Sequence, residues 1–329
     1  ESMKERAMSS KLDNIILGGG QLSGEAGGYS FGAISEKEST TLIQDAFHLG
    51  IRSIDTAPIY GFGESEKRIA KGISCFARED IILHNKGGIF FDSNKRIDIS
   101  NERKIIEKMF YQSLKDLKTD YIDYYYIHHS DPRCDIRYAL EFLNELKEKK
   151  LIHSIGLSNS NMNDYQKGLE VAKIDAFQEE SNLLTNHFSF LANIDLKTRN
   201  DLSFIGVSLF DKGILSGSVK DEKRVFHEKD VRRWAPWWKK EKEKREKKIM
   251  KVSLIEKELK DIYPSFNIYH LSLSYLQYSL KNKTNNQQVV GLKNMRQLEY
   301  FTSCFKEIDE SVFLNWKKHY PHHFLPDEK

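Results

Sequence analysis

The sequence predicts an α/β protein with one domain, a (β/α)8 TIM barrel. Short apolar segments with strand character alternate with amphipathic helical segments along most of the 329 residues. Such alternation favours parallel strands that are joined by right-handed crossovers. Eight units of this kind in about 290 residues also match the usual size of a barrel.

The first five strand–helix units follow one another without interruption. In the first helix, Leu42, Ala46 and Leu49 share one face, and Gly50 is a typical helix stop. The predicted strands are residues 14–20, 51–55, 80–88, 121–131 and 151–160, and the helices that follow them are residues 36–50, 64–73, 101–119, 136–150 and 162–173.

The last three strands are predicted at residues 174–184, 202–213 and 287–294, and residues 295–305 form the closing helix. No Pro/Gly/Ser-rich linker divides the chain. We therefore predict an N-terminal segment, residues 1–14, and a barrel over residues 15–329 with an insertion near residues 226–262.

This insertion, the Trp/Lys-rich segment, lies between the seventh and eighth strands. Trp234, Trp237 and Trp238 precede seven basic and three acidic residues from Lys239 to Lys248. A charge run of mixed sign is typical of a solvated helix. The tryptophans either pack that helix against the barrel or line the mouth of a substrate site.

The alternative fold is an open, doubly wound dinucleotide-binding sheet. Such a fold places a G-x-G-x-x-G turn and a helix directly after its first strand. Here Gly18, Gly19 and Gly20 are followed by Gln-Leu-Ser-Gly, with no helical pattern behind them. The barrel is favoured for this reason.

The composition limits the partners and the location of the protein. Its 51 basic and 48 acidic residues, a net charge of +3, provide no support for nucleic-acid binding. No apolar run approaches the ~20 residues that cross a bilayer, and the polar N-terminus has no signal-peptide core. The three cysteines lie far apart in the sequence, which suits a reducing compartment. We expect a cytoplasmic protein with a small-molecule substrate, and its oligomeric state stays open.

Polar side chains follow three successive barrel strands. Asp55 and Tyr60 lie on either side of Pro58 after the second strand, Lys86 comes at the end of the third, and His128 follows the fourth. Because the carboxyl ends of the strands meet at one face of a barrel, these groups should converge there.

The four groups suit the reduction of a carbonyl. Tyrosine has a reference pKa of about 10, and a neighbouring Lys86 ammonium should lower it. Asp55 would hold that lysine in place and keep it charged. His128 would donate a hydrogen bond to the substrate carbonyl, so that Tyr60 acts as general acid while a cofactor supplies hydride.

The sequence resembles the aldo-keto reductase family in several motifs, in the right order, from about residue 15 to residue 301. The stretch Asp-Thr-Ala-Pro-Ile-Tyr-Gly at residues 55–61 is similar to that family's tyrosine signature. Further similarities cover the lysine strand, the histidine strand, the Gly-Leu-Ser-Asn motif, the Ser-Leu-Phe-Asp-Lys-Gly loop, the Phe-x-x-x-Asp-x-Arg element and the closing cofactor motif.

The resemblance implies a barrel that binds NADP(H) or NAD(H) across its C-terminal face. It makes Tyr60 the proton donor, Asp55 and Lys86 its tuning pair, and His128 the residue that orients the carbonyl. Lys293 falls where a basic residue often meets the ribose 2′-phosphate, which favours NADP(H). The implied cofactor-binding residues are Ser158, Asn159 and Gln178 at the nicotinamide carboxamide, Ser208, Leu209 and Gly213 at the pyrophosphate, and Gly291, Lys293, Arg296 and Gln297 in the closing motif.

Two other functions stay open. The first is a metal-dependent hydrolase, because His84, Asp55, His128 and His129 are possible zinc ligands. It leaves Lys86 without a role, and we expect no metal. The second is a nicotinamide-binding redox sensor or regulatory subunit with little turnover. The substrate is not defined by the sequence, although the aromatic residues Tyr29, Phe31, Phe90 and Phe91 and the three tryptophans are candidates to surround it.

Overall fold

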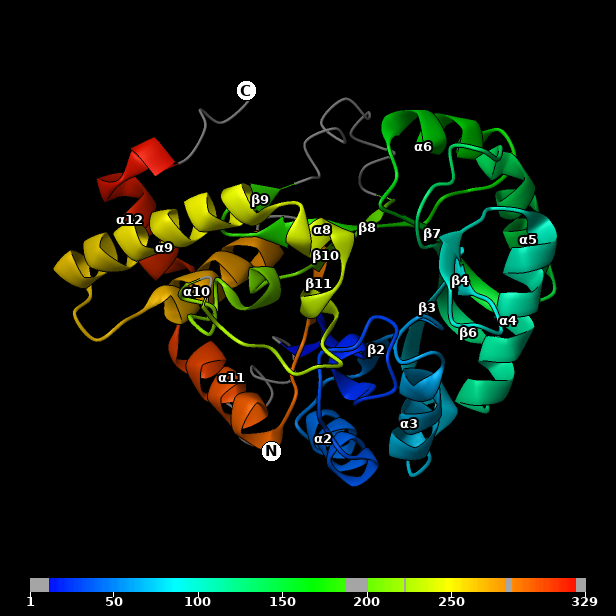
Figure 1. Ribbon diagram of the computed structural model, residues 1–329, viewed down its shortest axis with the longest axis horizontal. Helices are drawn as coiled ribbons and strands as arrows, with labels where there is room; N and C mark the ends of the chain where they lie inside the picture. The colour runs from blue at the N-terminus through cyan, green and yellow to red at the C-terminus, as the bar shows by residue number, and fades with distance from the viewer. Residues whose placement is uncertain (1–11, 187–200, 222, 282–285, 324–329) are drawn as a thin grey trace.

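The computed structural model describes residues 12–186, 201–221, 223–281 and 286–323, in which eight parallel strands close into a barrel (Figure 1). The ring closes because β10 pairs with both β8 and β11, and β11 pairs with β1. In barrel order the strands are β1 Ile15–Gly18, β2 Ser53–Asp55, β3 Ile82–Gly87, β6 Ile122–Ile127, β7 Ile152–Ser158, β8 Ala176–Asn182, β10 Ser203–Val207 and β11 Asn286–Val290. The predicted (β/α)8 barrel is confirmed.

Helices follow the strands and cover the outside of the barrel (Figure 1). They are α2 Glu36–His48, α3 Glu64–Ile73, α4 Arg103–Leu117, α5 Ile136–Glu148, α6 Met162–Leu169, α10 Ile268–Lys281 and α11 Met295–Glu307. Helix α2 illustrates how the sequence sets their ends. Ser35 and Glu38 form a reciprocal capping box at its start, and Gly50, at φ 111°, follows its end.

Two hydrophobic cores support the barrel. Inside it, Ile16, Tyr126, Ala176 and Ile205 pack together, and a larger core lies between the strands and the surrounding helices. A separate cluster forms where α9 Lys242–Ile262, α10 and α12 Glu310–His319 meet, and it includes Trp316. The Trp/Lys-rich segment therefore contributes to a core of its own beside the barrel.

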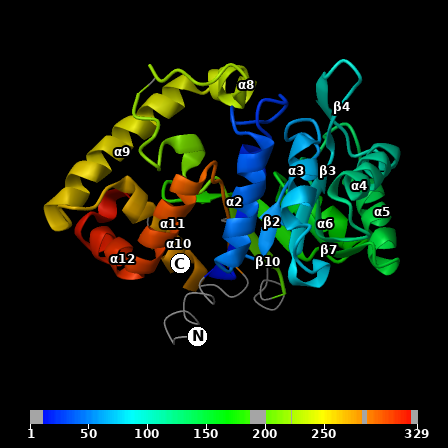
Figure 2. The ribbon, with the colours of Figure 1, turned by 90° about the horizontal axis from the view of Figure 1, so that it is seen from below.

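Several elements were not predicted. They include the hairpin of β4 Ile89–Phe91 and β5 Ile97–Ile99, the short strand β9 Thr185–Asn186, the helix α8 Pro236–Lys239 and the helices α10 and α12. In Figure 2, α8 and β4 lie at the same end of the barrel. In the described part of the chain, no helix combines the length and the apolarity that crossing a membrane requires. The one-domain organisation stays a prediction.

Candidate active site

The predicted polar residues converge at the carboxyl ends of β2, β3 and β6. The Lys86 ammonium lies 2.5 Å from Asp55 Oδ1 and 3.3 Å from the Tyr60 hydroxyl, and it also donates to the Thr56 carbonyl. Lys86 is 1% exposed and Asp55 is 2% exposed. The barrel therefore holds a buried ion pair in direct contact with the tyrosine.

A tight turn places Tyr60 beside this pair. Its backbone N–H donates to the Ala57 carbonyl, and its own carbonyl accepts from Ser65. Tyr60 also forms a bridge with Gly28, whose φ is 58°. A β-carbon on Gly28 would lie 2.4 Å from the Ile59 carbonyl oxygen, so only glycine fits this approach. The loop after β1 thus fixes the turn that carries the tyrosine.

Burial sets the direction in which the pKa of Tyr60 is shifted. Burial alone would lower the pKa of Lys86, but the Asp55 carboxylate and the Tyr60 hydroxyl raise it above its usual value. Burial also raises the pKa of Tyr60, and the nearby ammonium opposes this only in part. Lys86 thus lowers the pKa of Tyr60 as expected, but desolvation of the phenolate is the larger effect, so the net pKa lies above the reference value.

His128 directly follows β6 and presents its ring to Tyr60. The two ring centroids lie 6.1 Å apart, with the rings perpendicular. Burial, together with Lys86 and His129, holds the pKa of His128 well below its usual value. The imidazole is therefore neutral at physiological pH and keeps one N–H as a donor.

The three residues expected at the nicotinamide carboxamide lie around this cluster. Gln178 donates from Nε2 to Asp55 Oδ2 at 2.8 Å. Asn159, at φ 47°, donates to the His128 carbonyl at 2.9 Å and to Ser158 Oγ at 3.2 Å. Their observed contacts are thus within the protein: Gln178 orients Asp55, and Asn159 holds the backbone of His128.

A cavity of about 530 Å³ opens beside Tyr60, between the ends of β1, β10 and β11. Six of the residues expected to bind the cofactor line it: Ser208, Leu209, Gly213, Gly291, Lys293 and Gln297. Arg296 is exposed and does not belong to the lining. Asp55 and Tyr60 also contribute to its wall. One cavity therefore borders both the site of the buried ion pair and the loops that we expect to bind the cofactor.

Four cationic side chains line this cavity, and the sequence singled out only one of them, Lys293. The Lys293 ammonium donates to the Phe31 carbonyl at 2.8 Å. The others are Lys212, Arg224 and Arg232. The Phe-x-x-x-Asp-x-Arg element contained the signal for Arg232, which pairs with Asp230 at 2.7 Å and donates to the Lys212 carbonyl at 2.7 Å.

The aromatic candidates divide into lining and structural residues. Tyr29, Phe31 and Trp237 line the cavity. Phe90 and Phe91 do not, and Phe91 instead packs on Phe62 with centroids 4.7 Å apart.

The other two tryptophans pack elsewhere. Trp238 is buried in the cluster around α9, and Trp234 lies 6.0 Å from Tyr29 while remaining partly exposed. Helix α9 carries the charge run, and its Lys248 pairs with Asp211 at 2.7 Å, next to the loop that contributes Gly213. Of the two roles expected for the tryptophans, Trp238 therefore packs against α9, and Trp237 lines the cavity.

The metal-site alternative finds no geometric support at the barrel mouth. His84 is fully buried, accepts or donates a hydrogen bond with Tyr126 at 2.8 Å, and stacks on Tyr124 at 4.4 Å. Burial lowers the pKa of His84 to about 3. Because Asp55 is paired with Lys86, these residues do not form a three-ligand group within the described residues.

The chain is similar to known proteins over most of its length. The model of the "Aldo/keto reductase family" matches residues 14–321. An aldo-keto reductase of Bacillus subtilis, YhdN, is 30% identical over 251 residues, which cover 76% of this chain and 74% of that protein. The Schizosaccharomyces pombe protein named "Aldo-keto reductase yakc [NADP(+)]" is 28% identical, with 82% and 78% covered. The Escherichia coli "NADH-specific methylglyoxal reductase" is 26% identical over 54% of this chain and 58% of its own length.

Among solved structures, the glycerol dehydrogenase AKR11B4 of Gluconobacter oxydans shares the fold. It superimposes with a TM-score of 0.72 at 20% identity, covering 97% of this chain and 95% of that one.

Proposed function

Because the chain belongs to the aldo/keto reductase family and is therefore an NAD(P)-dependent oxidoreductase of carbonyl and alcohol groups, we propose that it reduces a small aldehyde or ketone with Tyr60 as general acid. The observation that carries this proposal is the contact of the Tyr60 hydroxyl with a buried, paired lysine at the cavity wall. The reverse oxidation of a sugar or another hydroxy compound would use the same groups.

The proposed proton transfer follows from the electrostatics of the cluster. The raised pKa of Tyr60 keeps its hydroxyl protonated at neutral pH, as a proton donor requires. As the proton leaves, the phenolate that develops is stabilised by the Lys86 ammonium 3.3 Å away. Asp55 keeps the ammonium charged, and Gln178 keeps Asp55 in place.

His128 would orient the carbonyl. Its neutral imidazole can donate one N–H, and its ring lies next to that of Tyr60, with the centroids 6.1 Å apart, although of the two only Tyr60 lines the cavity. A carbonyl oxygen between them would accept two hydrogen bonds, from Tyr60 and His128. These bonds strengthen as negative charge develops on the oxygen.

The cavity residues fit a nicotinamide dinucleotide. Its four cationic side chains suit the diphosphate, although Lys212 and Arg232 also pair with Glu180 and Asp230. The bound cofactor supplies the hydride. We propose that Lys293 reads the 2′-phosphate and favours NADP(H) over NAD(H), a preference that the names of the relatives leave open, since one is NADP(+)-linked and one NADH-specific.

The substrate would enter beside Tyr29, Phe31 and Trp237. These aromatic walls suit a small molecule with an apolar face, such as an aryl aldehyde or a sugar.

The decisive test is Tyr60→Phe, which removes one hydroxyl and preserves the ring. We expect turnover on a panel of aldehydes and ketones to fall at least 100-fold, within the roughly 10²–10⁴-fold range of general acids, while the Kd for NADPH stays within about twofold. Equal turnover of both proteins would refute the assigned role. If the wild-type protein binds NADPH and reduces nothing on the panel, the redox-sensor alternative takes its place.

A further inference from the structure

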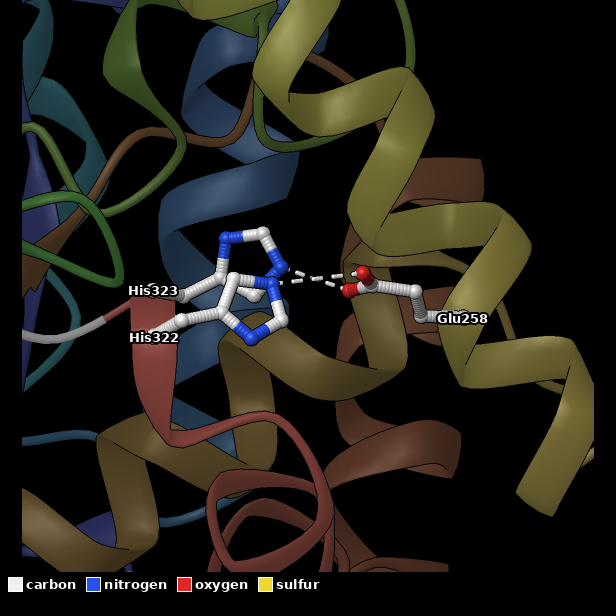
Figure 3. A group of neighbouring side chains, drawn as sticks. All are labelled: Glu258, His322 and His323. Carbon is white, nitrogen blue, oxygen red and sulfur yellow. Dashed lines mark hydrogen bonds and ion pairs between the residues drawn. The ribbon is translucent and has the colours of Figure 1, made fainter.

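A cluster of three potential metal ligands lies outside the cavity, where the end of the described chain meets α9. Glu258 of α9 faces His322 and His323, which belong to the short helix η6 Pro321–His323 (Figure 3). One ligand atom from each residue lies within 4.8 Å of the other two. None of the three residues lines the cavity described above.

We propose that Glu258, His322 and His323 bind a divalent transition-metal ion, for which zinc is the best match. Two imidazoles and a carboxylate are ligands that zinc accepts, at about 2.0–2.2 Å from the ion. Softer thiolate ligands, which favour copper(I), are absent from this cluster.

One of the two distances from a histidine to the carboxylate is close to that of a tetrahedral site. In such a site neighbouring ligand atoms lie about 3.3–3.4 Å apart when each is about 2.0–2.1 Å from zinc. His322 Nε2 lies 3.5 Å from Glu258 Oε1, and His323 Nε2 lies 2.5 Å from Glu258 Oε2. The first distance is close to this value, and the second would have to lengthen by about 1 Å for an ion to lie between the two groups.

The surroundings of the cluster favour a bound ion with one open position. The His323 ring stacks on Trp316 with centroids 5.3 Å apart, and its carbonyl accepts from Lys251, so this ligand is held in place. The Glu258 side chain is 13% exposed, while that of His322 is 60% exposed. Water therefore has access to the fourth corner, on the side of His322.

The simpler alternative is an ion pair between Glu258 and His323 that holds η6 against α9. That pair does not need His322, whereas a metal site does. Both Nε2 atoms point toward the same carboxylate (Figure 3). His322 is thus the residue that separates the two explanations.

The experiment measures Zn²⁺ binding to the untagged full-length chain by competition with a chromophoric chelator. We expect one ion per chain with a Kd on the order of micromolar, and binding at least tenfold weaker in His322→Ala and in Glu258→Gln. At a hundredfold excess over Kd, zinc should also raise the thermal midpoint by about 4 °C in the wild-type protein and not in His322→Ala.

His319→Ala is the matched control. His319 is an exposed histidine of α12 that lies outside the cluster and bonds the Asn315 carbonyl, so its removal should leave zinc binding unchanged. His322→Ala keeps the Glu258–His323 pair, so without zinc its thermal midpoint should equal that of the wild-type protein. Equal zinc affinity in His322→Ala and the wild type, or no binding below millimolar zinc, would overturn the proposal.

Discussion

The two sides of the barrel mouth differ in where their charged side chains lie and in what they are paired with. On one side, which we call the buried half, Asp55, Tyr60, Lys86 and His128 lie at the ends of β2, β3 and β6, and the charges are neutralised within the protein. On the other side, which we call the open half, Lys212, Arg224, Arg232 and Lys293 line a cavity near β10 and β11.

This difference indicates which kind of negative charge each half can stabilise. The buried half is complete without a ligand, because Lys86 and Asp55 satisfy each other and Gln178 fixes the second oxygen of Asp55. Such a site can stabilise negative charge that develops only during the reaction. The open half gathers four cations around a large cavity, and although Arg232 pairs with Asp230 and Lys212 with Glu180, such a group of cations suits an anion that arrives already charged.

The largest expected effect comes from Lys86→Met in the buried half. Losing the ammonium leaves Asp55 buried without its cation, which should destabilise the fold by about 3–5 kcal/mol. Turnover should fall by about 10²–10⁴-fold because the Tyr60 phenolate loses its stabilising charge. Urea unfolding and steady-state kinetics measure the two losses separately.

The double variant Lys86→Met with Asp55→Asn sharpens this result. Removing both charges should restore part of the stability and none of the activity. If activity returns together with stability, the pair has only a structural role and the comparison between the two halves fails.

Glu66 is a second buried acidic residue close to the buried half, and its ionisation can be tested through stability. This carboxyl accepts a hydrogen bond from Asn85, next to Lys86 in β3, at 2.8 Å. Burial raises the pKa of Glu66 from 4.5 to about 7. Between these values the folded chain binds more protons than the unfolded chain, so stability should fall as pH rises from about 4.5 to about 7 and then level off.

Glu66→Gln should remove this penalty, because the amide keeps an acceptor for Asn85 and carries no charge. At 1.36 kcal/mol per pKa unit, the variant should be more stable than the wild-type protein by about 3 kcal/mol at pH 8 and nearly equal to it at pH 4.5. Urea unfolding at the two pH values measures this, with Glu79→Gln, an exposed position, as control. A difference that does not change with pH would mean that Glu66 has the same pKa in the folded and in the unfolded chain.

Lys293→Met should give the smallest effect, in the open half. We expect the Kd for NADPH to rise about tenfold, equivalent to about 1.4 kcal/mol, and the Kd for NADH to stay unchanged. Fluorescence titration with each cofactor measures both values.

Arg296→Met is the matched control for Lys293, since Arg296 is exposed and lies outside the cavity lining. Its affinity for NADPH should equal that of the wild-type protein. Equal weakening of NADPH and NADH by Lys293→Met would instead show that Lys293 acts by holding the Phe31 carbonyl.

Sequence periodicity was sufficient for the barrel and for the buried half. Asp55, Lys86 and His128 each come at the end of a strand, and parallel strands in a closed barrel bring such positions together. Whether a loop side chain faces the cavity depends on the path of the loop, which has no comparable period. For this reason the sequence could not show that Phe90, Phe91 and Arg296 lie outside the cavity lining, or that Lys212 belongs to it.

The direction of the pKa shift of Tyr60 could not be predicted from the sequence either. The motif shows that an ammonium is near the hydroxyl, but not how much water the fold removes from it. Desolvation and attraction act in opposite directions, and only packing decides which is larger.

The left-handed backbone at Asn159, φ 47°, has a consequence for engineering. A non-glycine residue in this region costs roughly 1 kcal/mol, so Asn159→Gly would relieve local strain. The same change removes the amide that donates to the His128 carbonyl. A glycine here would therefore exchange backbone strain for the loss of hydrogen bonds of similar size, so a screen for heat stability alone would not detect that the histidine is held less firmly.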